Sequence, residues 1–166
     1  QVVVSTNGGS GDGVAKLPER AAALARVAPD DKYVGLADPS LLAREFADLD
    51  LLDREVPSTS ELERRACEAE AAALAVKGVA KSGGASASSG IGGMVLVTST
   101  GFHGSYLRSS HGISTTAISG EGVNMERDYD FTSAPHASDL ASPDSVGRSA
   151  GERTVARANP RKVETC

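Results

Sequence analysis

The chain has 166 residues, a net charge of −5 and 40% hydrophobic residues, but only 4% aromatic ones. This length suits one domain, and the abundance of alanine and valine predicts a core of small side chains. An acidic chain without a basic cluster is poorly suited to phosphate backbones, and no apolar run approaches the roughly 20 residues of a membrane helix. Neither nucleic acid nor a membrane is therefore expected as a partner.

The first part of the chain predicts a strand, a glycine loop and two helices. A short strand is expected over Val2–Thr6, after which apolar residues at spacings of three and four predict a helix over 12–28. Pro18 inside this pattern predicts either a kink or a helix that begins at the proline. An aspartate followed by proline predicts the start of a second, short helix over 38–46.

The clearest helix is expected over 58–77. Ser58 and Glu61 have the spacing of a capping box, and Gly78 is placed to end the helix in the left-handed conformation. Cys67 falls on the inner side of this helix and is expected to be a buried small hydrophobic residue. Because Cys67 and Cys166 form no ligand or disulfide pattern, a reducing, cytoplasmic compartment is expected.

The second half of the chain predicts short strands joined by glycine-rich turns, and then a helix over 142–158. The strands are expected at 79–88, 93–99, 103–110, 113–119 and 124–133. Short neighbouring strands favour an antiparallel meander. The predicted fold class is α+β, with a curled antiparallel sheet of about four to five strands packed with two or three main helices in a single domain over 1–166.

The last predicted strand contains the sequence MERDYDF, which alternates strictly between two faces. Met125, Arg127, Tyr129 and Phe131 fall on one face, and we expect that face to be buried. The acidic face is then expected to be solvated, and its carboxylates are too far apart to hold one cation without other ligands. It consists of Glu126, Asp128 and Asp130. A buried Arg127 would need an internal ion pair or a stack on Tyr129; anchoring a peptide carboxylate is the less favoured alternative.

Other groups that could carry chemistry match no catalytic pattern. The glycine loop Gly8–Gly13 lacks the Gly-Lys-Ser/Thr and dinucleotide spacings, so a simple turn is predicted. His103 and His111 could approach across a hairpin, but with His136 they lack the helical zinc-protease spacing. Serines stand in strand and turn segments without a nucleophile elbow; they are Ser88, Ser89 and Ser99. No catalytic, cofactor-binding or metal-binding residue is therefore predicted.

Three stretches of the chain resemble the PmbA/TldD family, whose members were once labelled modulators of DNA gyrase. They are Pro29–Leu52, Gly101–Phe131 with its MERDY string, and Gly147–Lys162, which ends in NPRK. Within the family the chain is more similar to the PmbA branch, also called TldE. The resemblance implies a fragment of a longer chain, missing upstream strands and a downstream β-rich domain.

The resemblance also implies a function. In this family a TldD and a PmbA subunit pair around a chamber in which unfolded peptides are cleaved, and zinc is bound in a His-Glu-x-x-x-His motif of TldD. The chain is accordingly expected to be a non-catalytic amino-terminal domain of a PmbA/TldE-like subunit, inactive alone and without a cofactor of its own. Its expected partners are a TldD-like subunit, or a second copy, and unfolded peptides, which a sheet edge could hold as an added strand. The alternative is a regulatory module acting on DNA gyrase or DNA.

Overall fold

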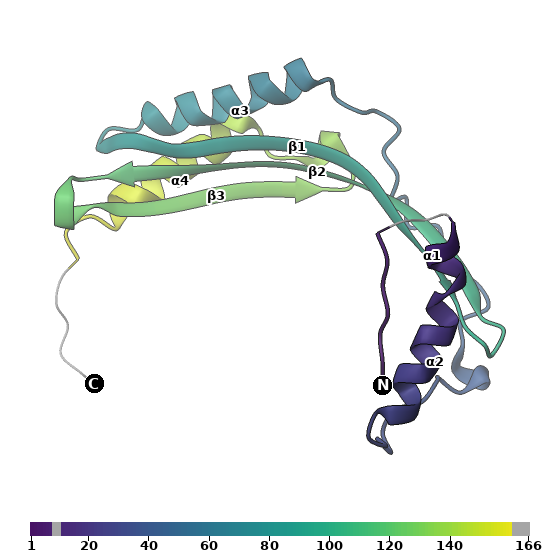
Figure 1. Cartoon of the computed structure of the whole chain (residues 1–166). Helices are drawn as coiled ribbons and strands as arrows, with labels where there is room; N and C mark the ends of the chain where they lie inside the picture. The colour runs from purple at the N-terminus through teal and green to yellow at the C-terminus, as the bar shows by residue number, and fades with distance from the viewer. Residues whose placement is uncertain (8–10, 161–166) are drawn as a thin grey trace. The chain divides into compact units, whose positions relative to one another are not determined.

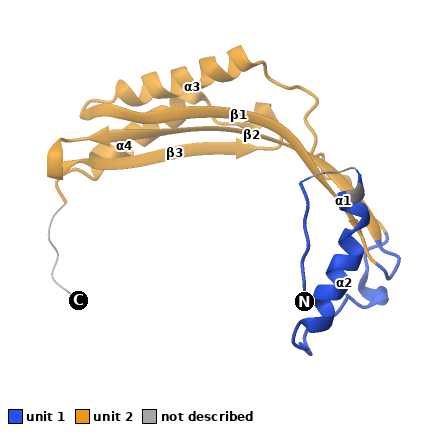
Figure 2. Cartoon of the chain, in the orientation of Figure 1, with its two compact units in different colours: residues 1–44, 99–102 blue, residues 45–98, 103–166 orange. Residues whose placement is uncertain are grey.

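A computed structural model describes residues 1–7 and 11–160 of the chain. They form two compact units, one of residues 1–7, 11–44 and 99–102 and one of residues 45–98 and 103–160 (Figure 2). Two compact units can belong to one domain, so the expected single domain over 1–166 stays a prediction.

The first unit is helical. Helices α1 (Asp12–Ala15) and α2 (Leu17–Val27) are separated at Lys16, and Pro18 lies in the first turn of α2. A proline is tolerated there because the first N–H groups of a helix have no partner within the helix. Of the two predicted alternatives, the helix that begins beside Pro18 is the correct one.

Two other predictions for this unit are wrong. Residues 1–7 have no regular secondary structure, because the described part of the unit offers no second strand to pair with Val2–Thr6. The helix expected over 38–46 is one 3-10 turn, η1 (Pro39–Leu41). Its predicted cap is present, since Asp38 Oδ1 accepts a hydrogen bond from the Ser40 N–H at 2.8 Å.

The second unit is an antiparallel sheet covered by two helices on one face (Figure 1). The sheet order is β1-β2-β3, and the strands are β1 (Val79–Val97), β2 (His103–Ser119) and β3 (Glu126–Ala134). The helices are α3 (Thr59–Leu74) and α4 (Pro143–Ala156). The predicted α+β class with an antiparallel sheet is confirmed.

The sheet has three long strands where four to five shorter ones were expected. The predicted breaks at 89–92 and 111–112 do not exist, because Gly90 and Gly92 of β1 pair with Ser110 and Arg108 of β2. Gly112 likewise pairs with residues of both β1 and β3. Glycine weakens a strand but does not turn it, and here the neighbouring strands supply the ladder through the glycine positions.

Local chemistry sets the ends of both covering helices. Ser58 Oγ accepts a hydrogen bond from the Glu61 N–H, and Ser142 Oγ accepts one from the Ser145 N–H, each at 3.2 Å. Gly78 follows α3 with a φ of +104°, which is the left-handed conformation predicted for it. The two helices therefore begin within one residue of their predicted positions.

The core consists of small residues, as expected. Its buried apolar members are Ala69, Ala73, Ile113, Ala117, Val146 and Ala150. Gly147 and Gly151 of α4 are also buried, and the absence of a Cβ lets α4 lie directly against Ala69 and Ala73 of α3. Cys67, in contrast, is exposed, so its predicted burial is wrong. The helix turns it away from the alanine stripe of Ala69 and Ala73 that contacts α4.

Among the described helices, none is both long enough and apolar enough to cross a membrane.

Candidate functional site: an ion cluster and an open sheet face

The sheet of the second unit has two unlike faces. Alternate residues of β2 are buried beneath α3 and α4; they are Ser109, His111, Ile113, Thr115, Ala117 and Ser119. Directly paired residues of an antiparallel sheet share a face. The register therefore places the residues between them on an open face with their partners, for example Ser86, Ser114 and Phe131 in one row and Gly84, Thr116 and Tyr129 in the next.

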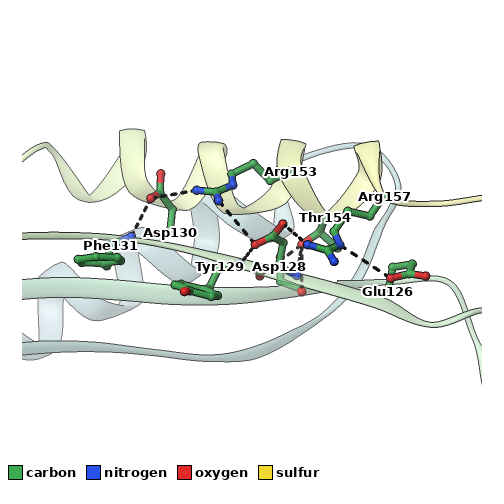
Figure 3. Close-up of polar contacts among 9 residues, drawn as sticks. Glu126, Asp128, Tyr129, Asp130, Phe131, Arg153, Thr154 and Arg157 are labelled. Carbon is green, nitrogen blue, oxygen red and sulfur yellow. Dashed lines mark hydrogen bonds and ion pairs between the residues drawn. The ribbon is translucent and has the colours of Figure 1, made fainter. Parts of the chain in front are cut away.

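The acidic residues of β3 lie on the covered face, and this reverses the prediction. Figure 3 shows the carboxylates of Asp128 and Asp130 directed toward α4. Arg157 Nη1 lies 3.1 Å from Asp128 Oδ2, and Arg153 Nη1 lies 3.5 Å from Asp130 Oδ1. Glu126 completes this ion cluster at 4.0 Å from Arg157 Nε. The strand alternates as predicted, but its acidic side faces inward because Arg153 of α4 and Arg157, which follows α4, pair with its carboxylates.

Thr154 fixes the same helix to the sheet at the centre of the cluster. Its side chain is fully buried, and Oγ1 accepts a hydrogen bond from the Asp128 N–H at 2.8 Å. The same hydroxyl donates to the Ala117 carbonyl oxygen at 3.1 Å. Thr154 Oγ1 therefore joins the backbone of β3, at the Asp128 N–H, to the backbone of β2, at the Ala117 carbonyl oxygen.

The outer edge of β3 is capped by the same carboxylates. Backbone N–H groups alternate in direction along a strand, so those of Tyr129 and Phe131 point away from β2. Asp128 Oδ1 accepts the first at 2.8 Å and Asp130 Oδ1 accepts the second at 2.9 Å. Because these two N–H groups already have acceptors, they are not available to pair with an added strand. This edge therefore does not support the strand addition suggested by the sequence.

These contacts lower the pKa of Asp128. The hydrogen bond from the Tyr129 N–H, followed by that from Arg157, holds it below the ordinary value of 3.8. A carboxylate with a depressed folded-state pKa stabilises the fold at pH values above its unfolded pKa. That stabilisation is lost as the pH falls through the folded pKa, which here means below pH 3.8.

Replacing Asp128 with asparagine should therefore flatten the acid limb of the stability curve. The variant is expected to be less stable than the parent at pH 6 and to approach it as the pH falls from about 4 toward 2. Urea unfolding followed by circular dichroism across this range measures the effect. Glu121→Gln, at an exposed carboxylate in the turn before β3, is the matched control. A constant difference between Asp128→Asn and the parent at all pH values would contradict the assignment.

The open face carries the apolar residues that the sequence placed in the core. Tyr129 and Phe131 are 56% and 61% exposed, and their rings stack with centroids 6.3 Å apart. Arg127 is also exposed, so the predicted buried guanidinium with an internal partner is wrong. Beside the rings, Ser86 Oγ and Ser114 Oγ are hydrogen-bonded at 3.0 Å in a lane of small residues.

The histidines do not form a site together. His103 and His111 lie eight residues apart on β2, about 27 Å along the strand, so they do not meet across a hairpin. His111 is 2% exposed, with Nε2 3.3 Å from Asp53 Oδ2, although neither ring nitrogen has a well-aligned hydrogen bond in the described chain. His136 Nε2 instead lies 2.7 Å from the Asp50 carbonyl oxygen.

Asp53 and Asp50 belong to a segment, residues 50–55, that is hydrogen-bonded to Ser109 of β2 and to residues 136–137 after β3. The Asp53 N–H donates to Ser109 Oγ at 2.6 Å, and Asp53 Oδ2 accepts from the Ala137 N–H at 2.8 Å. The bond from Ala137, then that from Glu55, lowers the pKa of Asp53. The hydrogen bond to the Asp50 carbonyl raises the pKa of His136. These shifts are explained by a structural fastening, with no catalytic role required.

The remaining candidates gain no partners that indicate chemistry. Ser88 lies on the open face, Ser89 is half-buried and Ser99 is in the turn between β1 and β2. In the glycine loop, residues 8–10 fall outside the described residues, as does Cys166. Within 1–7 and 11–160, no group of three or more histidine, cysteine, aspartate or glutamate residues could hold a metal ion.

Three partners of the acidic face were not predicted from the sequence: Arg153, Thr154 and Arg157. For Arg153 and Arg157, their spacing in the sequence could have indicated this role. Four residues of helix advance about 6 Å and two residues of strand advance about 6.6 Å, so Arg153 and Arg157 have the spacing of Asp130 and Asp128. Only the packing of α4 on β3, however, shows that these two sets face each other.

Comparison with known proteins places this unit in a family. Residues 53–158 match the family model described as the PmbA/TldA metallopeptidase central domain. The chain is 37% identical over 153 residues to Metalloprotease PmbA of Escherichia coli O157:H7, covering 92% of this chain and 34% of the relative. It is 36% identical over 165 residues to the Metalloprotease PmbA homolog of Haemophilus influenzae, covering 97% and 36%. The chain therefore belongs to the PmbA/TldD family.

Two solved structures have a similar fold. One is a candidate modulator of DNA gyrase from Bacteroides thetaiotaomicron, with a TM-score of 0.84 at 23% identity over 97% of this chain and 38% of that one. The other, also a candidate modulator of a DNA gyrase, comes from Thermotoga maritima, with a TM-score of 0.68 at 15% identity over 90% and 33%. The chain thus spans about a third of the length of the relatives it matches.

Proposed function

We propose that the chain is a non-catalytic domain of a PmbA/TldE-like subunit within a zinc metallopeptidase complex that cleaves unfolded peptides. The supporting observation is the match of residues 53–158 to the central domain of a metallopeptidase family. The site geometry agrees with a supporting role, because Asp128, Asp130 and Asp53 are all engaged by groups that hold elements together.

Zinc would belong to a TldD-like partner subunit. The described residues offer no group that fits the ion, so no catalytic step is assigned to this chain. Its contribution would be structural: α3 and α4 support one face of its sheet, and the other face is free to contact a partner or a peptide.

A zinc and cleavage assay tests this proposal. The chain alone is expected to retain less than one equivalent of zinc and to leave an unstructured peptide intact. The complex with a TldD-like subunit is expected to cleave the same peptide and to lose that activity with a chelator. One tightly held zinc per chain, or chelator-sensitive cleavage by the chain alone, would contradict the proposal. Micromolar, salt-sensitive binding to duplex DNA would instead support a module acting on DNA.

A further inference from the structure

The charges of the second unit are sorted between the two faces of its sheet. Strands β1 and β2 contain no aspartate or glutamate, and the three acidic residues in the first half of β3 face α4. The charged residues that these three strands place on the open face are all cations. They are Arg108 and, by register with Ile118, Lys81 and Arg127. The open face is therefore positively charged, although the net charge of the chain is −5.

These three cations are available to a ligand. Lys81, Arg108 and Arg127 are all exposed, and no carboxylate in the described part of the chain lies within 4.0 Å of their charged groups as an ion pair. By contrast, Arg153 of α4 and Arg157, the residue that follows α4, are already engaged with the carboxylates of β3. The open face therefore presents uncompensated positive charge.

Between the cations lies a surface suited to a polypeptide in extended form. Rows of serine, glycine and threonine on β1 and β2 let another backbone approach closely, and their hydroxyls can donate to or accept from peptide groups. The exposed, stacked rings of Tyr129 and Phe131 border this lane on β3. Arg108 and Ile118 are ten residues apart on β2, so the cations are spread over about 33 Å, the length of roughly ten extended residues.

We propose that the open face of the β1-β2-β3 sheet is a docking surface for an extended, acidic polypeptide segment. Carboxylates near the two ends of the segment would pair with Lys81 and Arg127 at one end and with Arg108 at the other. Apolar side chains between them would lie on Tyr129 and Phe131. The inference rests on the proposed function, which leaves this side of the sheet free to face a peptide, and it adds the charge and the position of the segment that binds there. Failure of the acidic peptide to bind would leave the expected results of the zinc and cleavage assay unchanged.

Charge density favours a peptide over a nucleic acid. A single strand would place several phosphates along this length, whereas the face offers three cations within an acidic chain. The face is also a better place for a peptide than the β3 edge, where the Tyr129 and Phe131 N–H groups are already bound.

Fluorescence polarisation with labelled peptides of about 12 residues tests the proposal. One peptide alternates glutamate with glycine and serine around a central leucine and tyrosine, and its matched control carries lysine at each glutamate position. The acidic peptide is expected to bind more tightly than the basic one, and added salt should weaken it. Equal binding of the two peptides, or no binding of the acidic peptide at millimolar protein, would overturn the proposal.

Charge reversal locates the surface. Lys81→Glu combined with Arg127→Glu is expected to weaken the acidic peptide about tenfold or more. Lys77→Glu, at an exposed lysine between α3 and β1, should change affinity by less than about twofold. If the double variant loses its circular dichroism spectrum, Tyr129→Ser with Phe131→Ser tests the face separately and should also weaken binding. Unchanged affinity in a folded variant would overturn the proposal, as would tighter binding of a thymidine oligomer than of the acidic peptide.

Discussion

Replacing Gly147 with alanine is expected to lower the free energy of unfolding by about 1–3 kcal/mol, although alanine is the better helix former. An added Cβ would overlap the carbonyl oxygen of Ala69 and would lie 2.8 Å from the Ala72 Cβ. The first of these is backbone of α3 and cannot rotate away. The two helices would have to separate, and the buried contacts of Ala69 and Ala73 would loosen.

Urea unfolding of the chain, followed by circular dichroism, measures this loss. Arg148→Ala, at the next position of α4, provides the matched control because the Arg148 side chain is 59% exposed and its ion pair with Asp144 is on the surface. The control is expected to unfold close to the parent, since surface ion pairs contribute little. A Gly147→Ala variant as stable as the parent, or more stable, would show that α3 and α4 are not in close contact.

Replacing Thr154 with valine is expected to lower the free energy of unfolding by about 1–3 kcal/mol, with almost no change in side-chain volume. The Asp128 N–H and the Ala117 carbonyl would lose the hydroxyl that they share, in a place that water does not enter. The cost arises from leaving buried polar groups without this partner.

Thr154→Ser separates the hydroxyl from the shape of the side chain. Serine keeps Oγ and loses only the methyl group, so it should retain most of the stability that valine loses. Amide hydrogen exchange at Asp128 adds a local measurement: faster exchange is expected in the valine variant and near-parental exchange in the serine variant. If valine proves as stable as threonine, then the hydroxyl is not the link between α4 and the sheet.

Those parts of the fold that depend on neighbouring residues in the chain could be predicted from the sequence. Ser58 and Ser142 begin α3 and α4 because a hydroxyl and the N–H three residues later are sufficient for a cap. Gly78 ends α3 for a similarly local reason. The strand count could not be obtained in this way, because Gly90 and Gly112 are held extended by partners that are distant in sequence.

The orientation of β3 could not be predicted for a related reason. Strict alternation shows that Asp128 and Tyr129 lie on opposite faces but does not show which face is covered. The usual preference for buried aromatic residues gave the wrong answer, because Arg153 of α4 and Arg157, which follows α4, are partners for the carboxylates. The candidate surface was therefore missed for the same reason: Tyr129, Phe131 and Arg127 had been predicted to face the core.

The capped N–H groups along β3 also limit how the chain can assemble. A pair of copies joined through their β1 strands would form a continuous sheet whose two borders are both β3. Each border would present two N–H donors, those of Tyr129 and Phe131, that Asp128 and Asp130 already occupy, and this disfavours the addition of a further strand there. The carboxylates that pair with Arg153 and Arg157 would thus also oppose the addition of a further copy along β3.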